Sequence, residues 1–139
     1  MKKILATLSI VLCASVSLLA QGINFETSNW DAAVAKAKKE NKIIFLDVYT
    51  TWCGPCKLMD KKTFIDANVG KYYNKNFINV KLDAEKGEGI AIANKYRVMA
   101  YPTNLYIDPN TGKVISDEKG FVPPDQFLER GKRAISKKK

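Results

Sequence analysis

Residues 42–57, KIIFLDVYTTWCGPCK, place two cysteines three positions apart directly after an apolar run, and no other feature restricts the fold as strongly. The run KIIFLDVY is rich in β-formers and continuous in its apolar character, which is typical of a strand buried on both faces of a sheet. The residues that follow Cys56 have helical periodicity. The sequence therefore predicts a strand, a tight turn and a helix, with Cys53 at the N-terminus of that helix.

Segments of helical and extended pattern alternate along the rest of the chain. A helix is expected to start after Ser28 as its N-cap, and the helix that carries Cys56 is expected to break or restart between Asp66 and Gly70. Predicted strands cover residues 42–49, 77–83, 104–108 and 113–117, and predicted helices cover residues 29–41, 56–76, 88–98 and 123–139. This order predicts an α/β fold in which parallel strands joined by helices precede an antiparallel hairpin.

The first twenty residues differ in kind from the rest. Lys2 and Lys3 precede the run ILATLSIVLCASVSLLA, which ends at the small residue Ala20. This pattern predicts a signal peptide over residues 1–20 and one domain over residues 21–139, located in the periplasm or secreted. The alternative is an uncleaved anchor, because the 17 mostly apolar residues approach the roughly 20 that span a bilayer.

Removal of this leader discards Cys13 and leaves Cys53 and Cys56 in a chain without histidine. Structural zinc needs four Cys or His ligands, covalent haem needs a histidine after the second cysteine, and a papain-like nucleophile needs a histidine base. We therefore expect no metal and no cofactor. A pair of cysteines in an oxidising compartment predicts a disulfide, and a loop this short restricts the unfolded chain very little. We therefore expect the disulfide to take part in a reaction and not to stabilise the fold.

The sequence resembles the thioredoxin family over residues 23–136. The resemblance lies in the apolar strand that contains Asp47, in WCGPCK at residues 52–57, in YPT at residues 101–103, and in the final hairpin and helix. The segments 57–83 and 120–134 are more similar to secreted thioredoxin-like modules, including the C-terminal domain of the disulfide-interchange protein DsbD. This resemblance implies a thioredoxin fold, with a central mixed sheet of four to five strands flanked by helices.

The expected chemistry assigns a role to each residue of the CGPC motif. A helix N-terminus stabilises a thiolate, so Cys53 is the expected nucleophile. Cys56, one helical turn later, is expected to resolve a mixed disulfide with the substrate. Gly54 is expected to permit the sharp turn, and Pro55 suits the first helical turn, where its missing N–H costs nothing. Trp52 is expected to flank the site, with packing in the core as the alternative.

Residues distant from the CGPC motif in the sequence complete the predicted site. Asp47 lies within an apolar strand, so its pKa is expected to be raised, and it is the expected proton acceptor for Cys56; the alternative is a solvent-facing position at a strand end. Asn79 stands where the resemblance implies a lysine near this acid, and Lys81 on the same strand face is the other candidate for that cation. The resemblance also implies a cis Tyr101–Pro102 bond, with the Tyr101 backbone pairing with substrate.

These observations predict a protein-disulfide reductase that acts outside the cytoplasm as a monomer. Its expected partners are cysteine-containing proteins, and a membrane-embedded donor is expected to resupply its electrons. The alternatives are an oxidant or isomerase that works in the opposite direction, and a redox-inert module that binds partners around Trp52, Tyr101 and Pro102. The net charge is +9, but the lysine clusters lack interleaved aromatic residues, so nucleic-acid binding is not expected.

Overall fold

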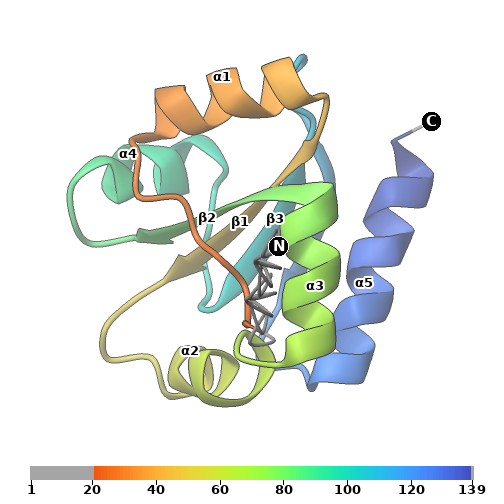
Figure 1. Cartoon of the computed structure of the whole chain (residues 1–139). Coiled ribbons are helices and arrows are strands. Elements are labelled where there is room, and N and C mark those ends of the chain that lie inside the picture. Colours follow the sequence, from red (N-terminus) through yellow and green to blue (C-terminus); the bar gives the residue numbers. More distant parts are fainter. Residues whose placement is uncertain (1–20, 139) are drawn as a thin grey trace, which may run out of the picture.

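The computed structural model describes residues 21–138, so the predicted signal peptide lies outside the described residues. Within residues 21–138, none of the helices has the length and apolar character needed to cross a membrane. The helices are α1 (Trp30–Glu40), α2 (Gly54–Leu58), a π-helical turn (Met59–Thr63), α3 (Ala67–Asn76), α4 (Glu88–Lys95) and α5 (Pro124–Lys137). The strands are β1 (Ile43–Tyr49), β2 (Phe77–Asp83), β3 (Thr103–Ile107) and β4 (Val114–Lys119). Figure 1 shows these elements around one central sheet.

The four strands form a mixed sheet in the order β2-β1-β3-β4. β1 pairs with β2 in parallel and with β3 antiparallel, and β3 and β4 form the expected antiparallel hairpin. The four-stranded mixed sheet is therefore confirmed, but the expectation that β3 runs parallel to β1 is wrong. The reason lies in α4, whose 8 residues extend only about 12 Å, whereas the 7 residues of β2 extend about 23 Å. This helix does not return the chain to the start of the sheet, so Thr103 enters β3 beside Val48, near the end of β1.

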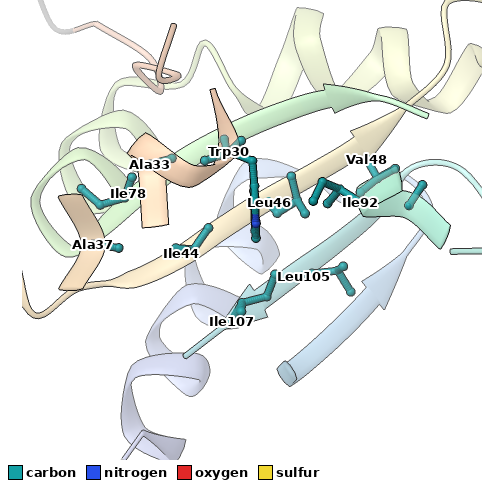
Figure 2. Close-up of a cluster of buried hydrophobic side chains, with 12 residues drawn as sticks. Trp30, Ala33, Ala37, Ile44, Leu46, Val48, Ile78, Ile92, Leu105 and Ile107 are labelled. Atoms are coloured by element: carbon teal, nitrogen blue, oxygen red, sulfur yellow. The ribbon is translucent and has the colours of Figure 1, made fainter. Parts of the chain in front are cut away.

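Two hydrophobic clusters cover the two faces of the sheet, which explains why β1 is apolar along its length. Figure 2 shows the first cluster, in which Trp30, Ala33 and Ala37 of α1 and Ile92 of α4 pack on β1 and β3. The second cluster brings α3, α5 and the π-helical turn onto the opposite face. Its buried members are Ile43, Phe45, Met59, Phe64, Val69, Tyr73, Phe77, Tyr106, Val122, Phe127 and Ala134. Because side chains alternate along a strand, Asp47 faces this second side.

The start of the first helix differs from the prediction by one residue. The N-cap of α1 is Asn29 and not Ser28, because the Asn29 carboxamide oxygen accepts a hydrogen bond from the Ala32 N–H at 2.9 Å. The break or restart expected between Asp66 and Gly70 is confirmed, because α3 begins at Ala67. The Asp66 carboxylate caps α3 by accepting from the N–H groups of Asn68 and Val69. Gly70 consequently lies within α3.

Residues 21–26, which we call the N-terminal segment, run beside β2 and α3 (Figure 1). The Glu26 N–H donates to the Asn79 carbonyl of β2 at 2.8 Å, and the Ile23 N–H donates to the Phe64 carbonyl at 2.7 Å. The segment also approaches α3 at Gly70, where a Cβ atom would lie 2.1 Å from the Gln21 carbonyl oxygen. Glycine at position 70 therefore permits backbone contact between the segment and the helix.

We expect Gly70→Ala to lower the free energy of unfolding by about 1–3 kcal/mol, since overpacking outweighs the better helix propensity of alanine. Gly54→Ala is the matched control, because a Cβ at Gly54 would meet no atom within 4 Å. Urea unfolding of the oxidised variants measures both effects. Equal stabilities for the two variants would contradict the close contact at Gly70.

Candidate active site

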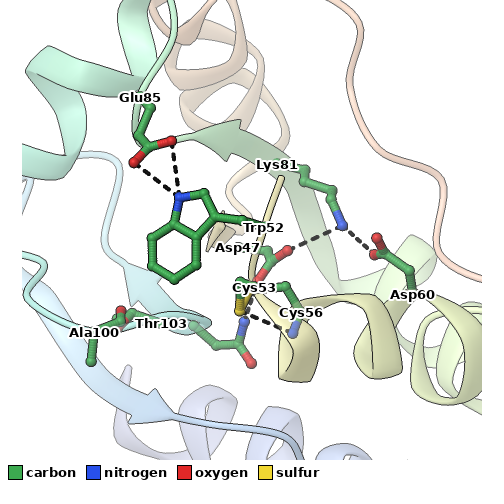
Figure 3. The surroundings of a disulfide bond; sticks show 10 residues. Asp47, Trp52, Cys53, Cys56, Asp60, Lys81, Glu85, Ala100 and Thr103 are labelled. Atoms are coloured by element: carbon green, nitrogen blue, oxygen red, sulfur yellow. Dashed lines mark hydrogen bonds and ion pairs between the residues drawn. A yellow bond between two sulfur atoms is a disulfide. The ribbon is translucent and has the colours of Figure 1, made fainter. Parts of the chain in front are cut away.

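The cysteine pair lies where β1 leads into α2, as expected. Cys53 is the N-cap of α2, and its Sγ accepts a hydrogen bond from the Cys56 N–H at 3.1 Å. Cys53 and Cys56 form a disulfide and are 3% and 2% exposed (Figure 3). Pro55 lies in the first turn of the helix. A sulfur that accepts a backbone N–H at a helix start is stabilised as a thiolate once the disulfide is reduced.

The expectation for Gly54 needs correction. Its backbone does not have a positive φ, and a Cβ at this position would meet no atom within 4 Å. Gly54 is therefore not required for the turn. It is exposed beside Cys53, where the absence of a side chain keeps the surface next to the sulfur open.

Asp47 lies in the middle of β1 and is 1% exposed, so the alternative of a solvent-facing position is wrong. Its Oδ1 accepts a hydrogen bond from the Asn104 side-chain amide at 2.8 Å, and its Oδ2 lies 3.4 Å from the Lys81 ammonium. Burial raises the pKa of Asp47 to about 6, although the Lys81 charge and the Asn104 hydrogen bond oppose this rise. Within residues 21–138, Oδ2 accepts no hydrogen bond. Oδ2 is therefore ion-paired with Lys81 but accepts no hydrogen bond, which makes it the oxygen that can receive a proton near neutral pH.

Lys81 is the cation near this acid, and it comes from the neighbouring strand. The parallel pairing of β1 and β2 places Lys81 directly opposite Asp47. The ammonium also pairs with Asp60 of the π-helical turn, so it bridges two carboxylates (Figure 3). Asn79 does not contact Asp47, because its side chain donates instead to the Asn24 carbonyl and to Asn74. Asn79 thus anchors the N-terminal segment.

Trp52 flanks the disulfide on the solvent side. It is 64% exposed, so the alternative of packing in the core is wrong. Its indole N–H lies 3.1 Å from both carboxylate oxygens of Glu85, which hold the ring in place (Figure 3). The Tyr101 ring meets it edge to face, with centroids 6.0 Å apart and an interplanar angle of 88°. The two rings form an aromatic wall beside the cysteines.

The loop before β3 supplies the other side of the site. The Tyr101–Pro102 peptide bond is cis, as the resemblance implied. The Thr103 hydroxyl donates to the Ala100 carbonyl at 2.7 Å, and the Gly120 N–H donates to the Pro102 carbonyl at 2.9 Å, so this loop is tied to itself and to β4. Met99, in the same loop, is 88% exposed. The exposed apolar side chains of this loop and of the aromatic wall thus include Met99 and Trp52.

Sequence reasoning missed Asn104, Asp60 and Glu85. The first follows from the antiparallel β1–β3 pairing, which sets Asn104 opposite Asp47. The sequence does show a polar residue, Asn104, inside the otherwise apolar strand TNLYI. Which residue it lies opposite, however, depends on the direction of that strand. Asp60 and Glu85 lie on the π-helical turn and after β2, and no local pattern distinguishes them from other exposed acids. Across residues 21–138, there is no group of three or more His, Cys, Asp or Glu residues placed to hold a metal ion.

Comparisons with known proteins identify related chains. A family model described as "Thioredox_DsbH: Protein of unknown function, DUF255" matches residues 18–126. The chain is 33% identical over 101 residues to chloroplastic thioredoxin Y2 of Arabidopsis thaliana, which covers 73% of the chain and 56% of that protein. It is 30% identical over 95 residues to the thiol:disulfide interchange protein DsbD of Yersinia pestis, which covers 67% of the chain and 16% of that protein.

A solved structure extends this similarity to most of the chain. A candidate disulphide-isomerase from Bacteroides thetaiotaomicron is 40% identical, with a TM-score of 0.71, and the match covers 83% of the chain and 94% of that protein. The curated relatives are longer proteins. The chain spans between 13% and 56% of the length of the curated relatives that it matches. The shared part is the domain that contains the CXXC pair.

The pKa of Asp47 leads to a prediction about stability. Because the pKa is about 6 in the folded protein and about 3.9 in an unfolded chain, the folded state holds the proton more tightly between these values. The contribution of Asp47 to the stability of the oxidised protein should therefore fall by roughly 2–3 kcal/mol as the pH rises from about 4 to about 8. Asp47→Asn should remove this fall and be the more stable protein at pH 8.

Urea unfolding of both oxidised proteins at pH 4 and pH 8 measures this difference. Asp66→Asn is the control, because Asp66 is a half-buried helix cap outside the sheet and asparagine can cap in its place. A wild-type stability that does not decline relative to Asp47→Asn would contradict the raised pKa.

Proposed function

The chain belongs to the Thioredox_DsbH family of thioredoxin-like proteins, and from this premise we propose that it is a thiol:disulfide oxidoreductase that reduces protein disulfides outside the cytoplasm. The observation that carries the proposal is the Cys53–Cys56 disulfide at the start of α2, with the buried carboxyl group of Asp47 on the adjoining strand. This arrangement combines a two-electron couple with a group that titrates near neutral pH.

The first step of the proposed reaction is attack by Cys53. In the reduced protein, the Cys53 thiolate attacks one sulfur of a substrate disulfide and forms a mixed disulfide, and the other substrate sulfur leaves as a thiolate. The N-cap position and the Cys56 N–H favour the thiolate. Trp52, Gly54, Pro55 and the Tyr101–Pro102 loop provide the surface against which the substrate binds, with the Tyr101 backbone pairing with the substrate as an added strand.

The second step is attack by Cys56 on the Sγ of Cys53. Asp47 accepts the proton of the Cys56 thiol at Oδ2, the Cys53–Cys56 disulfide forms, and the second substrate sulfur leaves as a thiolate that is protonated from water. The protein loses two electrons and the substrate gains them. A carboxyl group with a pKa of about 6 suits this role, because it is largely ionised at pH 7 and still binds a proton readily.

The direction of electron flow is argued from the residues between the cysteines. The Gly-Pro pair is that of thioredoxin, whose potential is about −270 mV, whereas the strong oxidant DsbA has a potential of about −120 mV. A protein of low potential donates electrons, and outside the cytoplasm it must be re-reduced. We therefore include a membrane-embedded electron donor in the proposal, together with removal of residues 1–20 and a periplasmic or secreted location for the domain of residues 21–139.

One observation favours a second candidate function. The 40% identical Bacteroides thetaiotaomicron protein is described as a candidate disulphide-isomerase, an activity that rearranges disulfides rather than removing them. The same two cysteines would serve it, with Cys53 attacking and the protein released without net oxidation. The reduction potential separates the two functions.

We expect Cys56→Ser to accumulate mixed disulfides through Cys53 with cysteine-containing proteins, because the resolving thiol is absent. Cys53→Ser should accumulate none above background, and insulin reduction should be lost in either variant, because the two-cysteine cycle cannot be completed. Non-reducing electrophoresis and mass spectrometry identify the adducts. Adducts formed by Cys53→Ser but not by Cys56→Ser would reverse the two roles.

We expect the reduction potential to lie nearer to −270 mV than to −120 mV. Since roughly 30 mV corresponds to about 1.4 kcal/mol for this couple, equilibration of the protein in glutathione buffers resolves the alternatives clearly. A potential near that of DsbA would make the protein an oxidant or isomerase. A redox-inert binding module would show no reversible dithiol formation under these conditions.

A further inference from the structure

Side-chain hydrogen bonds from α3 and β2 fix the N-terminal segment to the domain, although the segment itself is neither helix nor strand. The Asn74 side chain accepts from the Asn24 N–H at 2.8 Å and donates to the Gly22 carbonyl at 3.0 Å. The Asn79 side chain donates to the Asn24 carbonyl at 3.3 Å. Together with the backbone contact at Gly70, these bonds set the position of the residue that follows, Phe25.

Phe25 lies beside Lys81. The Lys81 ammonium is 5.7 Å from the centre of the Phe25 ring, 5.1 Å from that of Phe64 and 4.7 Å from that of Tyr49. The Phe25 and Phe64 rings themselves meet edge to face, with centroids 5.3 Å apart. Three rings from three separate parts of the chain therefore surround a single cation.

The charged groups that face this cation are two carboxylates on opposite sides. Asp47 is buried on β1, and Asp60 on the π-helical turn is half exposed, with a side-chain exposure of 48%. The Lys81 side chain is itself 18% exposed. A lysine with a long flexible stem can move between Asp47, Asp60 and water, so its position depends on the rings that confine it.

We propose that the N-terminal segment, through the Phe25 ring, is a positioning element that holds the Lys81 ammonium against Asp47. In this role Phe25 acts on Asp47 through Lys81. The inference rests on the proposed function only in treating Asp47 as the proton acceptor. It also explains Asn79, which occupies the position expected for a lysine but serves to anchor this segment.

The proposal predicts the direction of a measurable change. Without the Phe25 ring, Lys81 spends more time with Asp60 and water, and Asp47 loses part of the positive charge that lowers its pKa. The pKa of Asp47 should therefore rise from about 6 by roughly half a pH unit in Phe25→Ala. Phe25→Tyr keeps the ring and should leave the pKa unchanged, and Lys81→Met should raise it further.

The test is a carbon-13 NMR titration of the Asp47 side-chain carboxyl in the oxidised protein. The decisive comparison is a double-mutant cycle, because Phe25→Ala should have no further effect once Lys81 is replaced by Met. Ile23→Ala is the matched control: Ile23 belongs to the same segment and packs on the same cluster, so its loss should reduce stability and leave the pKa of Asp47 unchanged.

Three results would overturn the proposal: an unchanged or lowered pKa in Phe25→Ala, an equal change in the Lys81→Met background, or the same rise in Ile23→Ala. If Phe25→Ala does not fold, Phe25→Leu keeps the apolar cover without the ring and should raise the pKa in the same direction. The titration reads Asp47 whether or not the protein exchanges disulfides. A protein without oxidoreductase activity would therefore refute the proposed function and leave this inference to be decided by the titration.

Discussion

The burial of one carboxyl group, that of Asp47, is the constraint on which the site depends. An ionised carboxylate in an apolar strand costs several kcal/mol unless neighbouring groups compensate it. The sheet provides this compensation from both sides, because β2 places Lys81 and β3 places Asn104 opposite the same residue. The compensation is incomplete, and the pKa stays raised to about 6. A carboxylate fully stabilised by its neighbours would have a low pKa and would accept a proton poorly. The incomplete stabilisation of Asp47 is therefore needed for its proposed role as a proton acceptor.

The direction of β3 connects this carboxyl group with the substrate-facing surface. Because β3 runs antiparallel to β1, its first residue, Thr103, lies beside Val48, and the Tyr101–Pro102 loop lies at the end of β1 from which the cysteines follow. A parallel β3 would begin at the opposite end of the sheet. The strand therefore supplies Asn104 to the buried side of the site, and the loop that leads into it supplies Tyr101 to the exposed side, where the aromatic wall with Trp52 stands.

Local sequence patterns predicted most of the helices and strands, whereas the residues that they missed depend on contacts between distant parts of the chain. The apolar run of β1, the helix start at Cys53 and the edges of β2 depend on neighbouring residues in the sequence, so their boundaries agree with the prediction to within a residue or two. Asn104, Asp60 and Glu85 acquire their roles from partners between 21 and 57 positions away. The choice between Asn79 and Lys81 depended on register, because both face the same side of β2 and only Lys81 pairs with Asp47.

The position of the N-terminal segment affects both the edge of the sheet and the surroundings of Lys81. β2 is an edge strand of the sheet, and exposed edges pair readily with other chains. The bond from the Glu26 N–H to the Asn79 carbonyl, and the Asn79 side chain on Asn24, occupy part of this edge. The same anchoring sets Phe25 over the Lys81 ammonium. Because the contacts of the segment begin at Gln21 and Gly22, cleavage after Ala20 retains all of them, whereas trimming beyond Gly22 would remove both the close contact with Gly70 and the bond to Asn74.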